Sequence, residues 1–298
     1  MKVQSNGLEF EVEVQGDSAA PVVLLIMGLG MQLTAWPPAF VRSLVDAGYR
    51  VIRFDNRDIG LSTKIAAKAP NLIWQALRFR VGLAVQSNYT LRDMVEDTRG
   101  ILDALQVERC HVIGASMGGM IAQGLASHYP QRVISLTSIM STSGARGLPQ
   151  AKPKATMAIL SRPTSRDREA LLAHSAKVFR VIGSPGFPVD ETDLHARISA
   201  GLDRSFYPAG TVQQLAAIMA SGDRSDELRA ITAPTLVLHG REDPLVPLKN
   251  GEDTAAKIKG AKFEVIDGMG HDLAPGVVTE LMKRVMPFLA SAGAAASR

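Results

Sequence analysis

A serine with a glycine two residues to either side of it stands between a predicted strand and a predicted helix. Residues 110–113 form a short apolar run bounded by glycine, which indicates a buried strand. Residues 120–129 carry apolar side chains separated by alanines, which suits a buried helix. Residues 114–118, which lie between them, read Gly-Ala-Ser-Met-Gly. A turn this tight would make side chains two positions before or after Ser116 collide with neighbouring backbone, so the glycines are required there.

Predicted strands and helices alternate along most of the chain. After the first strand each strand is followed by a helical segment, and this order predicts an α/β fold with a mostly parallel sheet and helices on both faces. The predicted strands are 8–14, 22–27, 51–54, 110–114, 133–140, 235–239 and 263–266. The predicted core helices are 40–47, 91–105, 120–128, 253–258 and 277–289.

Two regions interrupt this alternation. Residues 141–230 show helical periodicity broken by proline and glycine, which predicts a helical cap inserted after the sixth core strand. The core domain is then formed by residues 1–140 and 231–298. The smaller region, 64–89, is predicted to flank the cap. A cap can cover a site, exclude water and shape a pocket, and the alternative is a fixed cluster of packed helices.

Ser116 needs partners before it can do chemistry. A serine hydroxyl is a poor nucleophile near neutral pH, and it requires a histidine to take its proton and an acid to orient that histidine. Of the six histidines, His271 follows a Gly-Met-Gly loop directly after the strand 263–266, and it can reach across the top of a sheet. His239 also ends a strand, but a structural role is favoured for it. The other histidines are predicted to be a packed core residue, His111, or to lie on helix surfaces, His128, His174 and His195.

Asp243 is the predicted acid. It lies in the loop at the carboxyl end of the strand 235–239, and Pro244 fixes the turn after it. Glu242 is the nearest alternative, with an exposed loop carboxylate as its other interpretation. Asp243 is favoured because a shorter side chain ahead of a rigid proline suits a fixed acid. The order serine, aspartate, histidine differs from both common serine-protease orders.

Acyl transfer also needs two backbone N–H donors for the oxyanion that develops in the transition state. Met117, the residue after Ser116, is predicted to supply the first. The second is predicted to come from Leu29, in the sequence Met-Gly-Leu-Gly at residues 27–30 that follows the apolar run 22–26. Glycines on both sides of Leu29 allow the backbone to turn its amide inward.

These motifs together resemble the α/β-hydrolase superfamily, and in particular its cap-bearing serine esterases and lactonases. The resemblance spans nearly all of the chain. The matching stretches are a His-Gly-x type loop at 28–30, the nucleophile elbow at 114–118, the acid loop at 240–243 and the histidine loop at 268–271.

One residue departs from the family pattern. Met27 stands where many members carry a histidine before the glycine. The stretch 54–62 is similar to a loop of the polyketide methylesterase and bacterial esterase branch, where its role is mostly structural. We therefore assign no chemistry to Arg57 or Asp58.

The expected activity is hydrolysis of carboxylic esters of small to medium size through an acyl-enzyme on Ser116. No cofactor and no metal are expected, and no Walker A, H-E-x-x-H or paired C-x-x-C sequence occurs. Hydrolysis of lactones, perhydrolysis and C–C bond hydrolysis by the same three side chains are open alternatives. A non-catalytic small-molecule-binding protein of the same fold is the alternative from a different class.

Composition limits the partners. Apolar residues make up 46% of the 298 residues, which is ample for a large core. The net charge is +4, but the basic residues are scattered and do not interleave with aromatic ones, so no nucleic-acid partner is expected. The chain opens without an apolar signal segment and holds no run of about 18 apolar residues, so we expect a cytoplasmic protein with no membrane span. The single cysteine, Cys110, is predicted to be a small core residue.

Overall fold

The strands form a single sheet that is mostly parallel. The computed structural model describes residues 1–296, without the side chains of residues 76, 79, 80 and 296. Within these residues, eight strands lie in the order β1-β2-β4-β3-β5-β6-β7-β8. The pairs β1–β2 and β2–β4 are antiparallel and all later pairs are parallel. The strands are β1 (Lys2–Ser5), β2 (Leu8–Gln15), β3 (Val22–Ile26), β4 (Arg50–Phe54), β5 (Cys110–Ala115), β6 (Val133–Ile139), β7 (Thr235–Gly240) and β8 (Lys262–Ile266).

The sheet was predicted correctly except at its first edge. The strand at Lys2–Ser5 was not predicted, because four residues give too short a pattern to recognise. It exists because its residues pair with the start of β2, from Lys2 opposite Glu11 to Ser5 opposite Leu8. A two-residue turn at Asn6 and Gly7, both with positive φ, connects the two strands and is the common hairpin connection.

The central strand β3 is apolar along its whole length because both faces of the sheet are covered. In β3 all five residues are buried. Leu24 and Ile26 belong to the core cluster on one face, whereas Val23 and Leu25 belong to the cluster on the other. This alternation is the two-residue period of a strand.

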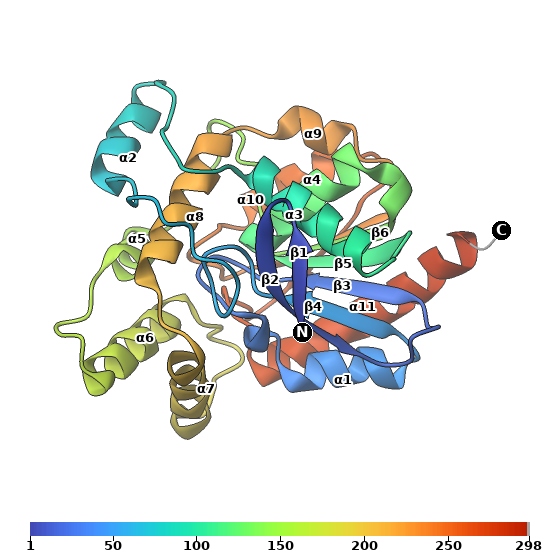
Figure 1. The fold of residues 1–298 in the computed structure, drawn as a ribbon, viewed down its shortest axis with the longest axis horizontal. Coiled ribbons are helices and arrows are strands. Elements are labelled where there is room, and N and C mark those ends of the chain that lie inside the picture. The colour runs from blue at the N-terminus through green and yellow to red at the C-terminus, as the bar shows by residue number, and fades with distance from the viewer. Residues whose placement is uncertain (297–298) are drawn as a thin grey trace.

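Helices cover both faces of the sheet (Figure 1). On one face α1 (Pro38–Asp46) and α11 (Pro275–Ala296) pack side by side, and on the other α3 (Leu91–Ala104) and α4 (Met117–His128) do so. A capping box between Thr90 and Asp93 fixes the start of α3. The predicted core helices are present, although α11 continues to Ala296 rather than ending at 289. The remaining elements around the core are α10 (Lys249–Lys257), η1 (Leu33–Ala35) and η2 (Pro130–Arg132).

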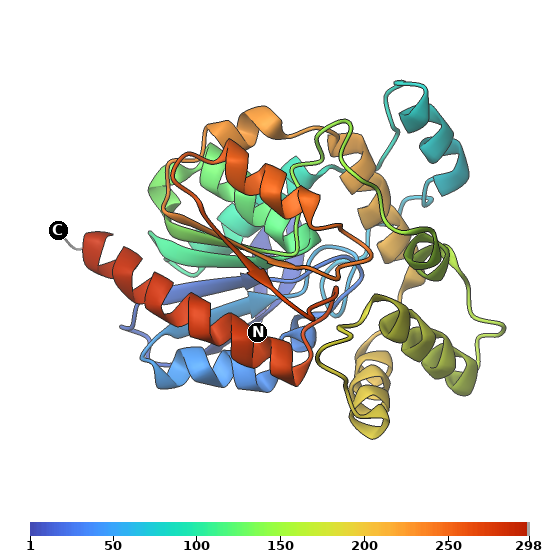
Figure 2. The same cartoon turned by 180° about the vertical axis from the view of Figure 1, so that it is seen from behind.

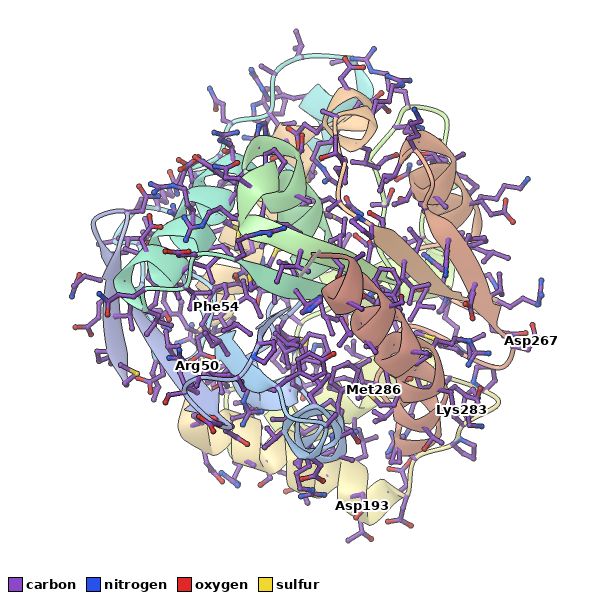
Figure 3. The ribbon with its side chains drawn as sticks, turned by 90° about the vertical axis from the view of Figure 1, so that its right-hand side faces the viewer. Arg50, Phe54, Asp193, Asp267, Lys283 and Met286 are labelled. Carbon is purple, nitrogen blue, oxygen red and sulfur yellow. The ribbon has the colours of Figure 1, made fainter. Side chains whose placement is uncertain are left out.

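The long C-terminal helix closes one face of the sheet. Figure 3 shows α11 in front, with Lys283 and Met286 labelled on it. Met286 packs against the core cluster that α11 shares with α1, while the Lys283 side chain is largely exposed. The helix therefore presents an apolar side to the sheet and a polar side to solvent.

The predicted helical insertion follows the sixth strand. Residues 141–230, which we call the cap segment, connect β6 to β7. Except for residues 225–229, which pack against α4, their helices lie with α2 (Leu72–Arg80) at the end of the molecule opposite the C-terminus (Figures 1 and 2). The helix α2 packs against α8, so the region 64–89 does flank the cap segment. The helices of the cap segment are α5 (Pro153–Leu160), α6 (Arg168–Ile182), α7 (Glu191–Arg204), α8 (Pro208–Ser221) and α9 (Ser225–Arg229).

None of the helices within residues 1–296 combines the length and the apolar character needed to span a bilayer.

His111 is buried in β5, as predicted, and it makes folding sensitive to acid. Its side chain is 1% exposed and its Nδ1 lies 2.8 Å from Ser135 Oγ. Burial lowers the pKa of His111 from the ordinary 6.5 to about 4. Between pH 6.5 and 4 the imidazole is protonated in the unfolded chain but neutral in the folded chain. Protonation of His111 therefore does not reduce the free energy of unfolding above pH 6.5, and it reduces that free energy progressively as the pH falls toward 4.

We therefore expect His111→Gln to flatten the dependence of the free energy of unfolding on pH between 6.5 and 4. Urea denaturation at a series of pH values measures this slope. Ser135→Ala is the control, since it removes the hydrogen bond but keeps the imidazole, and it should lower stability without changing the slope. Equal slopes in wild type and His111→Gln would show that this histidine does not titrate differently on folding.

Candidate active site

Ser116 lies at the sharp turn between β5 and α4. Its φ of 56° and ψ of −120° are unusual for a residue other than glycine. Two hydrogen bonds hold it there. The Ser116 amide donates to Ile139 O of β6 at 2.9 Å, and Ser141 Oγ donates to Ser116 O at 2.8 Å. The strained backbone conformation of Ser116 is thus held in place by β6 and the residues that follow it.

The glycines on either side of this turn have no room for a side chain. A Cβ at Gly114 would overlap Gly118 O, and a Cβ at Gly118 would overlap Ile26 O of β3. Both obstacles are backbone atoms of packed elements, so they cannot move aside. This is the crowding that the sequence predicted for both positions.

The structure brings together the serine, histidine and aspartate predicted from the sequence. His271 Nε2 lies 3.0 Å from Ser116 Oγ, and His271 Nδ1 lies 2.7 Å from Asp243 Oδ2. His271 is 7% exposed and Asp243 2%. The three residues follow β5, β7 and β8, and they form one chain of hydrogen bonds. Such a chain can move a proton from the hydroxyl to the imidazole.

The Asp243 carboxylate is fixed by its own loop. Its Oδ1 accepts the amides of Leu245 at 2.9 Å and Val246 at 2.8 Å, which leaves Oδ2 for His271. The alternative acid, Glu242, points elsewhere and accepts the Gly268 amide at 2.6 Å. Glu242 therefore ties the acid loop to the histidine loop.

His239 stands closer to this group than its predicted structural role suggested. It is fully buried, with Nε2 2.7 Å from Val246 O and 3.7 Å from Asp243 Oδ2. A carbonyl oxygen only accepts, so Nε2 of His239 carries the proton. Burial lowers the pKa of His239, which keeps its ring neutral. The ring thus supports the loop that holds Asp243.

The cap segment is hydrogen-bonded to the histidine loop. The sequence did not predict this contact. The His271 amide donates to Ile182 O, at the end of α6, at 2.7 Å. The Gly270 amide donates to Ser184 Oγ at 2.9 Å, and the Ser184 hydroxyl in turn bonds Asp272. Burial raises the pKa of Asp272. Because these contacts join residues about 90 positions apart, no local sequence pattern could indicate them.

Two backbone amides beside Ser116 are available to a ligand. A Cβ at Gly28 would lie 3.1 Å from Ser116 Cβ and 3.7 Å from Ser116 Oγ, so the loop that carries Leu29 runs against the serine. Met117 is the first residue of α4, where amides have no partner within the helix. Across residues 1–296, neither the Leu29 amide nor the Met117 amide has a hydrogen-bond acceptor. The sequence analysis names the same two amides as oxyanion donors, and that role stays a prediction here.

The stretch 54–62 is structural, as predicted. Arg57 forms a buried ion pair with Asp97, with Nη2 2.6 Å from Oδ1. Asn56 Nδ2 donates to Met27 O at 2.9 Å. The Asn56 bond fixes the backbone next to the Leu29 loop, and the Arg57 pair ties the stretch to α3. Neither side chain is hydrogen-bonded to Ser116, Asp243 or His271 in the described residues.

Comparison with known proteins agrees with this geometry. The family whose description is the alpha/beta hydrolase fold matches residues 21–274. The chain therefore belongs to the α/β-hydrolase family. Its relatives are hydrolases, and this class holds for the chain as well.

The similar proteins carry the names of several kinds of hydrolase. Rhodomycin D methylesterase DauP of Streptomyces sp. (strain C5) is 29% identical over 279 residues, which cover 87% of each chain. The putative carbamate hydrolase RutD of Variovorax paradoxus (strain S110) is 30% identical over 289 residues, covering 95% of this chain and 96% of the relative. Among solved structures, the enol-lactonase from Burkholderia xenovorans LB400 superposes with a TM-score of 0.73 at 24% identity, covering 97% of this chain and 100% of that one.

The crowding at Gly118 leads to a prediction about stability. Gly118→Ala should lower the free energy of unfolding by about 1–3 kcal/mol, because the new methyl group meets the backbone of β3. Gly201→Ala in α7 is the matched control, since the nearest atom to its Cβ would be 3.9 Å away and alanine favours a helix. Urea denaturation of both variants measures the difference. Equal stability of the two would contradict the crowding at the turn.

Proposed function

We propose that the protein is a serine esterase that cleaves carboxylic esters through an acyl-enzyme on Ser116. The observation that carries the proposal is the position of His271, with one ring nitrogen 3.0 Å from Ser116 Oγ and the other 2.7 Å from Asp243 Oδ2. A histidine held in this way has one nitrogen free of its proton and aimed at the hydroxyl.

The first half of the reaction forms the acyl-enzyme. His271 Nε2 takes the proton of Ser116 as Oγ attacks the ester carbonyl carbon. The carbonyl oxygen becomes an oxyanion, and the amides of Leu29 and Met117 donate to it. The intermediate collapses as His271 gives its proton to the leaving alcohol oxygen. Asp243 stabilises the charged imidazole throughout.

The second half releases the acid. A water molecule loses a proton to His271 Nε2 and attacks the acyl carbon, and the same two amides stabilise the second oxyanion. His271 then returns the proton to Ser116 Oγ as the acid leaves. All proton transfers use groups of this chain and water, so the mechanism needs no cofactor and no metal.

The relatives support acyl transfer more broadly than ester cleavage alone. A methylesterase and an enol-lactonase are among the similar proteins, and both names imply attack on an ester carbonyl. Lactone hydrolysis is therefore the nearest alternative, and perhydrolysis and C–C bond hydrolysis could use the same three residues. A purely binding protein is disfavoured, because it has no use for an aligned serine, histidine and aspartate.

Ser116→Ala should reduce hydrolysis of p-nitrophenyl acetate and butyrate by at least about 10³-fold, because the attacking atom is removed. Ser43→Ala, which changes a hydroxyl on the outer side of α1, should leave the rate unchanged. A fluorophosphonate probe should label the wild type once, at Ser116. Full turnover by Ser116→Ala would end the esterase proposal, and folded protein inert to both ester and probe would favour the binding protein.

Substitution of the two neighbouring carboxylates should separate their roles. Asp243→Asn should lower kcat by about 10³–10⁴-fold, since the amide no longer holds the imidazole in its reactive form. Glu242→Gln should lower it less than tenfold, because its bond to the Gly268 amide only supports the loop. Steady-state kinetics of both variants provide the measurement. The reverse order of the two effects would mean that Glu242 is the acid.

A further inference from the structure

A glutamine of the cap segment holds the loop that carries Leu29. The Gly30 amide donates to Gln214 Oε1 at 2.9 Å, and Gln214 Nε2 donates to Arg57 O at 2.9 Å. Gln214 lies in α8 and is completely buried. An amide N–H can only donate and a carbonyl oxygen can only accept, so these partners fix which way the side-chain amide faces.

Further contacts press the same loop against the cap segment. Gly30 has a φ of +70°, and a Cβ there would lie 2.8 Å from Thr211 Oγ1 of α8. Gln32 Nε2 donates to Gly201 O at 2.7 Å and to Ser205 O at 3.0 Å, both at the end of α7. The loop is thus held by two different helices of the inserted segment.

The loop needs this external support because its own sequence does not fix its path. Gly28 and Gly30 flank Leu29, and glycine adopts positive and negative φ about equally well. Gln214 accepts the Gly30 amide, whereas the Leu29 amide has no hydrogen-bond acceptor among residues 1–296. The bond from Gln214 therefore occupies the Gly30 amide and fixes the peptide group that follows Leu29.

We propose that Gln214 is a positioning residue for the oxyanion hole. It does not touch the substrate. It reaches from the cap segment to the Gly30 amide and holds the Leu29 amide where the oxyanion develops. The inference rests on the proposed esterase function, and it makes the cap segment part of the machinery that stabilises the transition state.

The expected effect falls on kcat. An oxyanion donor acts on charge that exists only in the transition state, so a misplaced donor slows the chemical step with little change in ground-state binding. Loss of one complete donor costs about 10²–10³-fold in kcat. Gln214→Met keeps the Leu29 amide but removes the hydrogen bond that holds its loop. We expect a loss of about 10–100-fold in kcat, with KM changed less than about threefold.

The chain offers a matched control one residue away. Gln213 lies on the same helix and is 1% exposed. Its Oε1 accepts Asn88 Nδ2 at 2.6 Å, and its Nε2 donates to Ile65 O at 3.3 Å. Gln213→Met therefore removes a buried glutamine that bonds the region 64–89 and not the Leu29 loop. A purely structural cost should appear in both variants.

The experiment compares Gln214→Met and Gln213→Met in kcat and KM for p-nitrophenyl butyrate. It also compares inhibition by two compounds. An alkyl boronic acid forms a tetrahedral adduct with Ser116 and resembles the transition state, whereas butyrate has a planar carboxylate and does not. Gln214→Met should lose affinity for the boronic acid by about the same factor as kcat and keep its affinity for butyrate. Gln213→Met should match the wild type in kcat and in its affinity for both inhibitors.

If Gln214→Met does not fold, Gln214→Asn provides the test, because it keeps an amide but is one carbon too short to reach both partners. Its kcat should fall at least about tenfold with KM unchanged. Equal kcat and equal boronic-acid affinity in the Gln214 and Gln213 variants, with an active wild type, would overturn this inference alone. A wild type that neither turns over esters nor reacts with a fluorophosphonate would overturn the proposed function and this inference together.

Discussion

The turn at Ser116 is the constraint on which the rest of the site depends. Ser116 is held at a φ of 56°, a value unusual for a residue other than glycine, because its backbone is hydrogen-bonded to β6 and to the first turn of α4. The same geometry lifts the Ser116 hydroxyl out of the sheet and leaves the Met117 amide at the free end of a helix. One backbone conformation therefore positions both the hydroxyl and the amide to which the proposed function gives the roles of nucleophile and oxyanion donor.

The other parts of the site meet this turn because they follow neighbouring parallel strands. Asp243 and His271 follow β7 and β8, and Leu29 follows β3. All three therefore lie at the carboxyl ends of the parallel strands, as Ser116 does. The cap segment then fixes the loops. Ile182 O holds the His271 amide, and Gln214 holds the Gly30 amide. The inserted helices are thus hydrogen-bonded to two of the loops that surround Ser116.

Much of the fold and of the candidate site could be predicted from the sequence, because the features concerned depend on residues close together in the chain. The strand–turn–helix at Ser116, the glycines around Leu29 and the proline after Asp243 each restrict a short stretch of backbone, so a pattern of a few residues reveals them. The contacts of Gln214, Ser184 and Glu242 could not be predicted in the same way. Each joins segments that only the finished fold brings together, and a buried glutamine on a helix has no distinctive neighbours in sequence. The edge strand β1 was missed for a related reason, since its pairing with β2 defines it more than its own four residues do.

The most direct test of the proposed site is a crystal structure of the protein after reaction with a fluorophosphonate ester. We expect a covalent bond from Ser116 Oγ to phosphorus, with one phosphoryl oxygen about 2.7–3.1 Å from both the Leu29 and the Met117 amide nitrogens. Phosphorus on another residue, or a phosphoryl oxygen directed away from these two amides, would contradict it.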